Sequence, residues 1–416
     1  MRNIITLLTG IIVSVVPAFS QLDRIYDFNP DEKGMIETLA KIEKKTDKFN
    51  LFLNMHGSFN LDWNGSEFNE AKFRMDQLRI EAKGDINDWL SYRYRQRLNK
   101  GNDMNGYRDN VMNSIDVAGF GLKLKKWSMF LGKQCAVYGG IEFEYNPIEI
   151  YQYSDMVSHM SSFMTGINIA YNFTPRQQLQ FQILNAYNGS SQEMYGDYQK
   201  AKIPLIYTLN WNGSFSNIYR ARWSASFMNE TKGEHRWYYA LGNDFYISDK
   251  FQIYFDWMYL REGVDRQGII TEIVQNNWQE TSGYKTAKTD MMSFLLHVNY
   301  HFHPQWNIFG KVMAENAGVY QSTQQAGAPD IQVEKGRYRT AWGYIGGIEF
   351  YPMKDRNLHF FAAYVGRSYR FASRAKAFGR SDYSTNRLSV GFIWAMPVFC
   401  HLSVKARCLN WTATGM

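Results

Sequence analysis

The sequence predicts an all-β chain that forms a transmembrane antiparallel β-barrel of about 16 strands. Three observations carry this prediction. Long segments alternate apolar and polar residues, about 16 such segments recur along the chain, and the connections between them alternate between short and long. The composition agrees, because 16% of the residues are aromatic and barrels place such residues at both membrane interfaces.

The first 48 residues differ from the rest. Residues 1–20 read as a secretory signal peptide, with Arg2, an apolar run and a small-residue cleavage site. Residues 21–48 are expected to form a periplasmic segment with a short amphipathic helix, because Met35, Leu39 and Ile42 share one helical face. No later run approaches the ~20 apolar residues of a membrane helix.

The segment 49–63 shows the alternation most clearly. Its odd positions are apolar from Phe49 to Trp63, and nearly all of its even positions are polar. Because successive side chains of a strand point to opposite faces, one face would meet lipid and the other water. The segment is long enough to cross a bilayer at a tilt.

Residues 89–100 carry a second kind of alternation. Arg93, Arg95 and Arg97 fall on one face, and Tyr92 and Tyr94 fall on the other. A membrane barrel accommodates both faces, because the tyrosines meet lipid while the arginines meet an aqueous interior.

The remaining segments repeat this design up to residue 399. The predicted strands lie near residues 49–63, 71–83, 89–99, 114–124, 127–134, 163–173, 178–186, 204–212, 218–227, 235–245, 251–261, 290–302, 306–315, 337–351, 358–368 and 387–399. Together they define a barrel domain at 49–399, followed by a tail at 400–416 whose role the sequence does not indicate.

The connections predict which end of the barrel faces which side. Tight turns are expected at residues 84–88, 174–177, 212–214, 248–250 and 303–305. Long loops are expected at residues 64–70, 100–113, 135–162, 187–203, 262–289, 316–336 and 369–386, with 228–234 as a short exception. Outer-membrane barrels have short periplasmic turns and long outer loops, so the chain is predicted to lie in the outer membrane of a Gram-negative bacterium.

Two local patterns resemble a known family. The first is the hairpin from Leu78 to Gly84 that leads into the arginine strand, and the second is Gly132-Lys133-Gln134 followed by Gly139-Gly140 and Asn146-Pro147. With the strand count, they make residues 49–399 similar to the phosphate-selective porin O/P family, in the style of its Bacteroidetes branch. The resemblance implies a homotrimeric outer-membrane porin in which the third loop narrows a water-filled pore.

The resemblance and the alternation together select two sets of candidate residues. The arginines expected to line the pore are Arg74, Arg79, Arg93, Arg95, Arg97, Arg220, Arg222, Arg339 and Arg367. The residues expected on the constriction loop are Glu142, Glu144, Glu149, Tyr151, Tyr153 and Asp155. Guanidinium groups lower the barrier for anions in a pore, while wall arginines that pair with carboxylates would only stiffen the wall.

The third loop departs from the family pattern. Residues 138–160 contain four acids and no lysine, whereas phosphate-selective relatives place lysines near the constriction. If the loop folds inward, its acids should face the wall arginines across the opening. Such a transverse field passes polar solutes of either sign.

A hairpin register can also be predicted. A turn at 84–89 would place Glu81 opposite Arg93 and Arg79 opposite Arg95, and a parity change near Asp76 indicates a β-bulge that brings Asp76 toward Arg97. Arg79 and Arg95 would then be the pair without a carboxylate.

Other functions are less consistent with the sequence. The net charge of +7 is modest for 416 residues and there is no basic arm, so no nucleic-acid partner is expected. No hydrolase, metalloprotease or P-loop motif is present, so the chain is expected to be no enzyme and to need no cofactor or metal. The expected partners are small polar or anionic solutes, such as phosphate, and outer-membrane lipid. The alternative is a secreted or surface all-β protein whose aromatic residues bind glycans.

Overall fold

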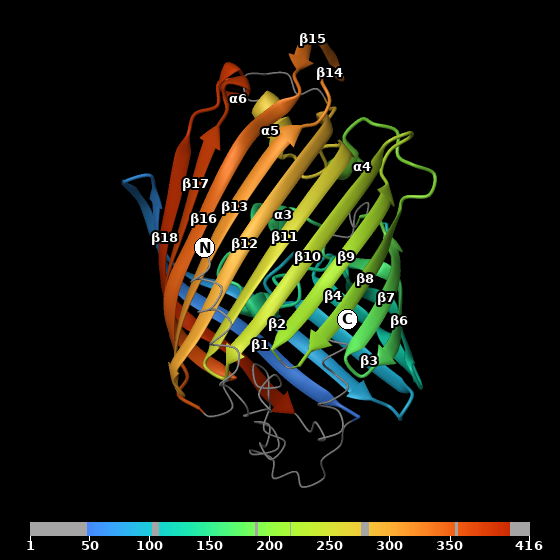
Figure 1. Ribbon diagram of the computed structural model, residues 1–416, viewed down its shortest axis with the longest axis vertical. Helices are drawn as coiled ribbons and strands as arrows, with labels where there is room; N and C mark the ends of the chain where they lie inside the picture. The colour runs from blue at the N-terminus through green and yellow to red at the C-terminus, as the bar shows by residue number, and fades with distance from the viewer. Residues whose placement is uncertain are drawn as a thin grey trace, which may run out of the picture.

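The computed structural model describes residues 48–101, 108–187, 190–216, 218–275, 283–353 and 357–399. Sixteen strands form one closed antiparallel barrel, which confirms the predicted fold (Figure 1). The predicted signal peptide, the N-terminal helix and the C-terminal tail lie outside the described residues.

The wall is built from consecutive strands that pair with their neighbours in the chain. Its strands are β1 (Asn50–Asn64), β2 (Glu67–Asp85), β3 (Leu90–Arg97), β4 (Ile115–Leu124), β5 (Trp127–Cys135), β6 (Phe163–Thr174), β7 (Gln177–Asn185), β8 (Leu205–Phe215), β9 (Tyr219–Asn229), β10 (His235–Ser248), β11 (Phe251–Val264), β12 (Ala287–His303), β13 (Trp306–Val319), β16 (Gly336–Phe350), β17 (Leu358–Phe371) and β18 (Tyr383–Phe399). The barrel closes where β1 pairs with β18, from Leu51 opposite Phe399 to Asn64 opposite Thr385.

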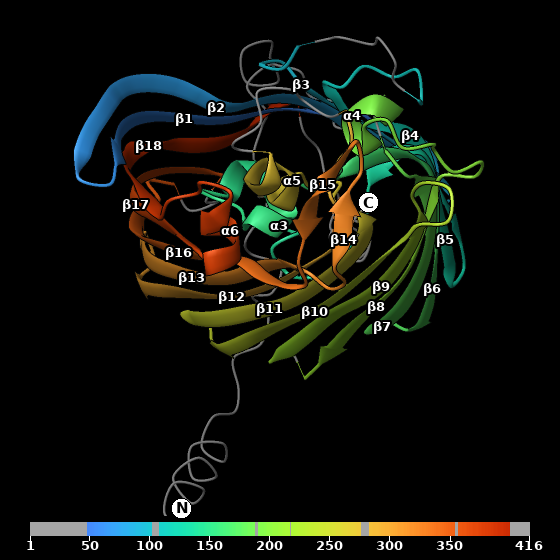
Figure 2. The ribbon, with the colours of Figure 1, turned by 90° about the horizontal axis from the view of Figure 1, so that it is seen from above.

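The outer loops carry the remaining elements. These are η1 (Pro147–Glu149), α3 (Asp155–Ser158), α4 (Ser191–Tyr195), α5 (Ile269–Val274), α6 (Ser373–Ala377) and the separate hairpin of β14 (Thr323–Gln325) and β15 (Ala328–Val333). Seen from above, α3, α5, α6 and this hairpin lie within the outline of the barrel (Figure 2). No helix among the described residues has the length and apolar character needed to cross a membrane.

The alternation of short and long connections is observed with two differences. The loop predicted at 64–70 is instead a two-residue turn, in which Gly65 adopts a φ of 62°, because β1 and β2 extend beyond their predicted ends. The turn predicted at 212–214 lies farther along the chain, because β8 continues to Phe215. All other predicted long loops stand at the end opposite the tight turns.

Two of the β-bulges change the face of an acidic side chain that matters for the site. The β1–β2 ladder skips Asp76 between the pairs His56–Gln77 and Gly57–Met75, which confirms the bulge predicted there. The β3–β4 ladder skips Asp116 between the pairs Arg95–Val117 and Gln96–Ile115. A bulge inverts the alternation of faces. Beyond a bulge, odd and even positions therefore no longer predict which side chains face the interior.

The buried core lies inside the barrel rather than between two layers. Residues 136–162, which we call the crossing loop, connect β5 to β6 and contribute Tyr138, Ile141, Ile148 and Met156 to one large apolar cluster. Inner-face side chains of the wall complete the cluster, among them Leu184, Ile206, Met228, Tyr254, Leu295, Met313 and Phe361. Burial of this apolar surface holds the crossing loop within the barrel.

Candidate functional site

The crossing loop is tied first to strands β9 and β11. The hydroxyl of Ser224 donates to the carbonyl of Tyr138. Farther along, the backbone N–H groups of Ile141 and Glu142 donate to the two carboxylate oxygens of Asp256, at 2.7 and 2.8 Å. Both carboxylate oxygens are therefore used to hold loop backbone against the wall.

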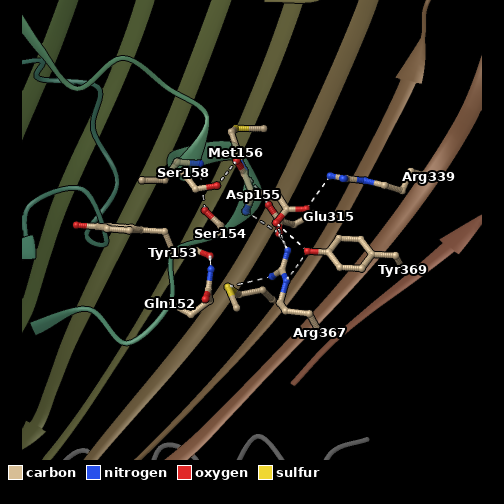
Figure 3. A network of polar contacts seen from close by, with 12 residues as sticks. Gln152, Tyr153, Ser154, Asp155, Met156, Ser158, Glu315, Arg339, Arg367 and Tyr369 are labelled. Carbon is tan, nitrogen blue, oxygen red and sulfur yellow. Dashed lines mark hydrogen bonds and ion pairs between the residues drawn. The ribbon is translucent and has the colours of Figure 1, made fainter. Parts of the chain in front are cut away.

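At α3 the loop contacts the next part of the wall, on β13, β16 and β17, across the barrel from β5, where the loop begins. The N–H groups of Asp155 and Met156 donate to the carboxylate of Glu315 on β13, at 3.0 and 3.1 Å. The side chain of Asp155 pairs with Arg339 on β16 at 2.7 Å and with Arg367 on β17. Figure 3 shows these side chains converging on α3 from neighbouring strands.

Arg367 joins the loop to the wall. Its Nη2 atom contacts Asp155 and also lies 2.8 Å from Glu315. The hydroxyl of Tyr369 accepts from Nε of Arg367 at 3.3 Å and donates to Asp155 at 3.4 Å. We call Asp155, Glu315, Arg339, Arg367 and Tyr369 the Asp155 network; two carboxylates and two guanidinium groups leave it electrically neutral.

Two other loop acids, Glu142 and Glu144, are neutralised in the same way. Glu142 pairs with Lys311 on β13 and accepts from the hydroxyl of Ser154 at 2.8 Å. Glu144 lies 2.8 Å from Arg220 and 3.4 Å from Arg222, both on β9. These two acids therefore contact the wall cations directly instead of facing them across an opening.

Glu149 and Tyr151 contact inner-face residues of β13, β16 and β17. Tyr151 stacks on Phe309 with ring centroids 4.7 Å apart, and its hydroxyl donates to Glu349 at 2.7 Å. The carboxylate of Glu149 lies 3.8 Å from Nε2 of His359, which is also 3.9 Å from Glu349. Burial and the nearby carboxylate of Glu349 raise the pKa of Glu149 to about 8. Tyr153 packs against the apolar cluster.

Three arginines on β2 and β3 share one carboxylate. Arg79, Arg95 and Arg97 lie 3.4, 3.5 and 2.9 Å from Asp116 on β4. Asp116 is fully buried, and the nitrogens Nε and Nη1 of Arg79 and Nε of Arg95 have no hydrogen-bond partner among the described residues. We call these four residues the basic cluster; it holds three cations and one anion.

The predicted hairpin register was wrong by two residues. Glu81 lies opposite Arg95, and Arg79 lies opposite Arg97. Glu81 still pairs with Arg93, at 2.8 Å on the diagonal. The prediction that Arg79 and Arg95 lack a carboxylate was also wrong, because Asp116 serves both.

Arg74 completes the predicted set. It lies near the outer end of β2, its side chain is half exposed, and it pairs with Asp76 at 3.3 Å. Asp76 therefore meets Arg74 and not Arg97, because its bulge lies closer to the outer end of β2. All nine predicted arginines stand on barrel strands and all six predicted loop residues stand on the crossing loop.

The sequence did not identify the wall residues that bind the crossing loop. Lys311 and Glu315 occupy the same strand face as Asn307, so alternation along β13 could have found them. Asp116 could not be found in that way, because its bulge inverts the parity set by Phe120 and Leu124.

Similarity to known sequences settles the family. The sequence profile of the family described as "Phosphate-selective porin O and P" matches residues 49–396. The chain belongs to this family. No curated protein sequence matches it.

Solved structures show the same fold at low sequence identity. The outer-membrane channel DcaP of Acinetobacter baumannii has a TM-score of 0.54 and 12% identity, over 84% of this chain and 99% of that one. The anion-selective porin from Comamonas acidovorans has a TM-score of 0.53 and 9% identity, over 83% and 99%. In-vitro folded OmpT of Vibrio cholerae has a TM-score of 0.51 and 11% identity, over 84% and 98%.

Family membership fixes the broad role. This porin is an outer-membrane channel of a Gram-negative bacterium and not an enzyme, as predicted. The alternative of a secreted glycan-binding protein is thereby wrong. Within the described residues, no group of three His, Cys, Asp or Glu side chains could hold a metal ion.

Proposed function

We propose that this porin passes small polar anionic solutes, phosphate among them, by passive diffusion along the basic cluster. The crossing loop narrows the interior in this proposal, and three chains assemble into a homotrimer. The family description supports phosphate as a solute, and family resemblance supports the trimer.

The excess of positive charge in the basic cluster carries the proposal. Loop acids cancel the arginines and the lysine of the opposite wall, as in the pairs of Glu144 with Arg220 and of Glu142 with Lys311. In the basic cluster three guanidinium groups face a single carboxylate, Asp116. Where little water is present the local dielectric constant is low, and a low dielectric constant strengthens the attraction between a group of guanidinium ions and an anion.

The crossing loop has the contacts expected of a fixed constriction. It is bound to β9, β11, β13, β16 and β17 through paired charges and backbone hydrogen bonds. A long loop inside a rigid barrel is commonly functional. We place the solute path on the β2–β4 side because the basic cluster lies there.

Reversal potentials in planar bilayers under a KCl gradient test the proposal. We expect wild-type protein to prefer anions, Arg95→Ala to weaken that preference, and Asp116→Asn to strengthen it. Arg374→Ala is a suitable control, because this exposed residue on α6 pairs with Glu334 away from the basic cluster.

Two results would contradict the proposal. The first is folded, heat-modifiable protein that gives no stepwise conductance. The second is a pair of variants, Arg95→Ala and Asp116→Asn, whose reversal potentials equal that of the Arg374→Ala control. Separately, a monomeric mass in mild detergent would reject the trimer.

A further inference from the structure

Two neighbouring turns at the periplasmic end carry cations without acidic partners. The turn between β4 and β5 contains Lys125 and Lys126, and the turn between β6 and β7 contains Arg176. All three side chains are exposed. Among the described residues, none of them forms an ion pair with a carboxylate within 4 Å.

The other described turns at this end differ in charge. The β2–β3 turn contains Asp88, and at its edge Asp85 pairs with Lys123 at 3.4 Å. The β10–β11 turn places Asp249 beside Lys250, and the β12–β13 turn, Pro304 and Gln305, has no charged residue. Among these turns, and within the described residues, positive charge without a carboxylate partner is therefore concentrated on the two adjacent turns β4–β5 and β6–β7.

A row of aromatic rings lies directly beside these turns on the outer face. Trp127 and Tyr171 are 4.6 Å apart between ring centroids, and Tyr171 and Phe173 are 5.0 Å apart. Trp127 is 52% exposed and Phe173 is 48% exposed, so both rings face the surroundings of the barrel. Aromatic rings at this height mark the interface between headgroups and acyl chains.

The two turns also form one unit. The carbonyl of Lys126 accepts from the backbone N–H of Asn172 at 2.9 Å, and Nζ of Lys126 donates to the carbonyl of Phe173 at 3.4 Å. Lys126 is thus held toward the β6–β7 turn and its Arg176. The two turns that carry the three cations are therefore joined beside the rings.

We propose that Lys125, Lys126 and Arg176 bind the phosphate of an anionic phospholipid in the periplasmic leaflet, with an acyl chain against Trp127 and Phe173. Lysine and arginine side chains next to a membrane attract anionic headgroups. The adjacent apolar rings select a lipid over a free phosphate ion, because only a lipid has a chain to cover them. This surface lies on the outside of the barrel and is independent of the proposed solute path.

The test uses full-length protein purified in detergent and titrated with phosphatidylglycerol, with bound lipid counted by native mass spectrometry. Each cation removed is expected to weaken binding about fivefold, so Lys125→Gln, Lys126→Gln and Arg176→Gln together should weaken it about 100-fold. The control removes the same charge at the opposite end of the barrel, through Arg370→Gln, Arg374→Gln and Lys376→Gln. It should bind phosphatidylglycerol like wild type.

Three outcomes would overturn the inference. Wild-type protein could bind phosphatidylcholine as tightly as phosphatidylglycerol, or the turn variant could bind phosphatidylglycerol as tightly as the control. Displacement of the lipid by millimolar inorganic phosphate would show a site for the free anion in place of a lipid site. A heat-modifiable band for both variants verifies that the barrel is folded.

Discussion

Removing Arg367 should release the crossing loop from the far wall. The side chain is buried, and its Nη2 atom contacts Asp155 and lies 2.8 Å from Glu315. At an effective dielectric constant of about 20, one such pair attracts by about 6 kcal/mol. The desolvation of the charges offsets part of this gain, so the Arg367→Gln variant should lose about 3–5 kcal/mol of unfolding free energy. The loss arises because Asp155 then keeps only Arg339 of its two guanidinium partners, and Glu315 loses the one ion pair that the described residues give it.

Urea unfolding of the protein in lipid vesicles measures this loss, and single-channel recordings report the mobility of the loop through current fluctuations. The matched control is Arg374→Gln, because its pair with Glu334 is exposed and should contribute about 0–1 kcal/mol. Adding Glu315→Gln to Arg367→Gln should recover part of the stability, since it removes one uncompensated charge. A loss of stability no larger than that of Arg374→Gln would refute the reasoning, as would strictly additive effects of the two substitutions.

Two further predictions concern the seat of the same loop. The raised pKa of Glu149 means that the packed loop favours the protonated carboxyl group. The contacts of the loop around Glu149 are therefore most stable below pH 4.5, and they lose stability as the pH rises through about 8. Current fluctuations in KCl should therefore grow between pH 4.5 and 8 in wild type and stay constant in Glu149→Gln; equal pH profiles would reject this role. In Gly242→Val, the added Cβ would lie 2.7 Å from Cα of Gly140, so the loop must move toward the lumen and single-channel conductance should fall. Gly310→Val, whose Cβ would make only an ordinary contact of 3.9 Å with the carbonyl oxygen of Ile345, should conduct like wild type. An unchanged Gly242→Val conductance would show that the loop moves without narrowing the path.

The strands of the wall could be predicted because alternation is a local property. Strand β11 was predicted at residues 251–261 and extends to Val264, because pairing continues beyond the apolar stretch. The outer part of β2 was missed for a related reason. Near Glu67 and Glu70 all side chains are exposed, so an apolar face no longer marks the strand.

The contacts of the site could be predicted only in part. Arginines and acids were assigned to the wall and the loop from parity and loop length, but their partners depend on how the loop crosses the interior. Asp155 and Arg367 are far apart in the chain, and no spacing in the sequence relates them. The position of Asp116 could not be predicted, because a one-residue bulge turns its side chain to the inner face and no residue type in the sequence marks that bulge.

The seam between β1 and β18 limits how this pore can change in size. The two strands pair along nearly their full lengths, and both the start of β1 and the end of β18 lie at the periplasmic end. If the barrel lost one strand, its last strand would run in the same direction as its first. The two strands would then pair in parallel, and the end of the last strand would lie on the outer side of the membrane. Gain or loss of a whole hairpin keeps both ends where they are and keeps every backbone group paired in the hydrocarbon layer. With both strand ends kept at the periplasmic end, the diameter of this pore therefore changes in steps of two strands.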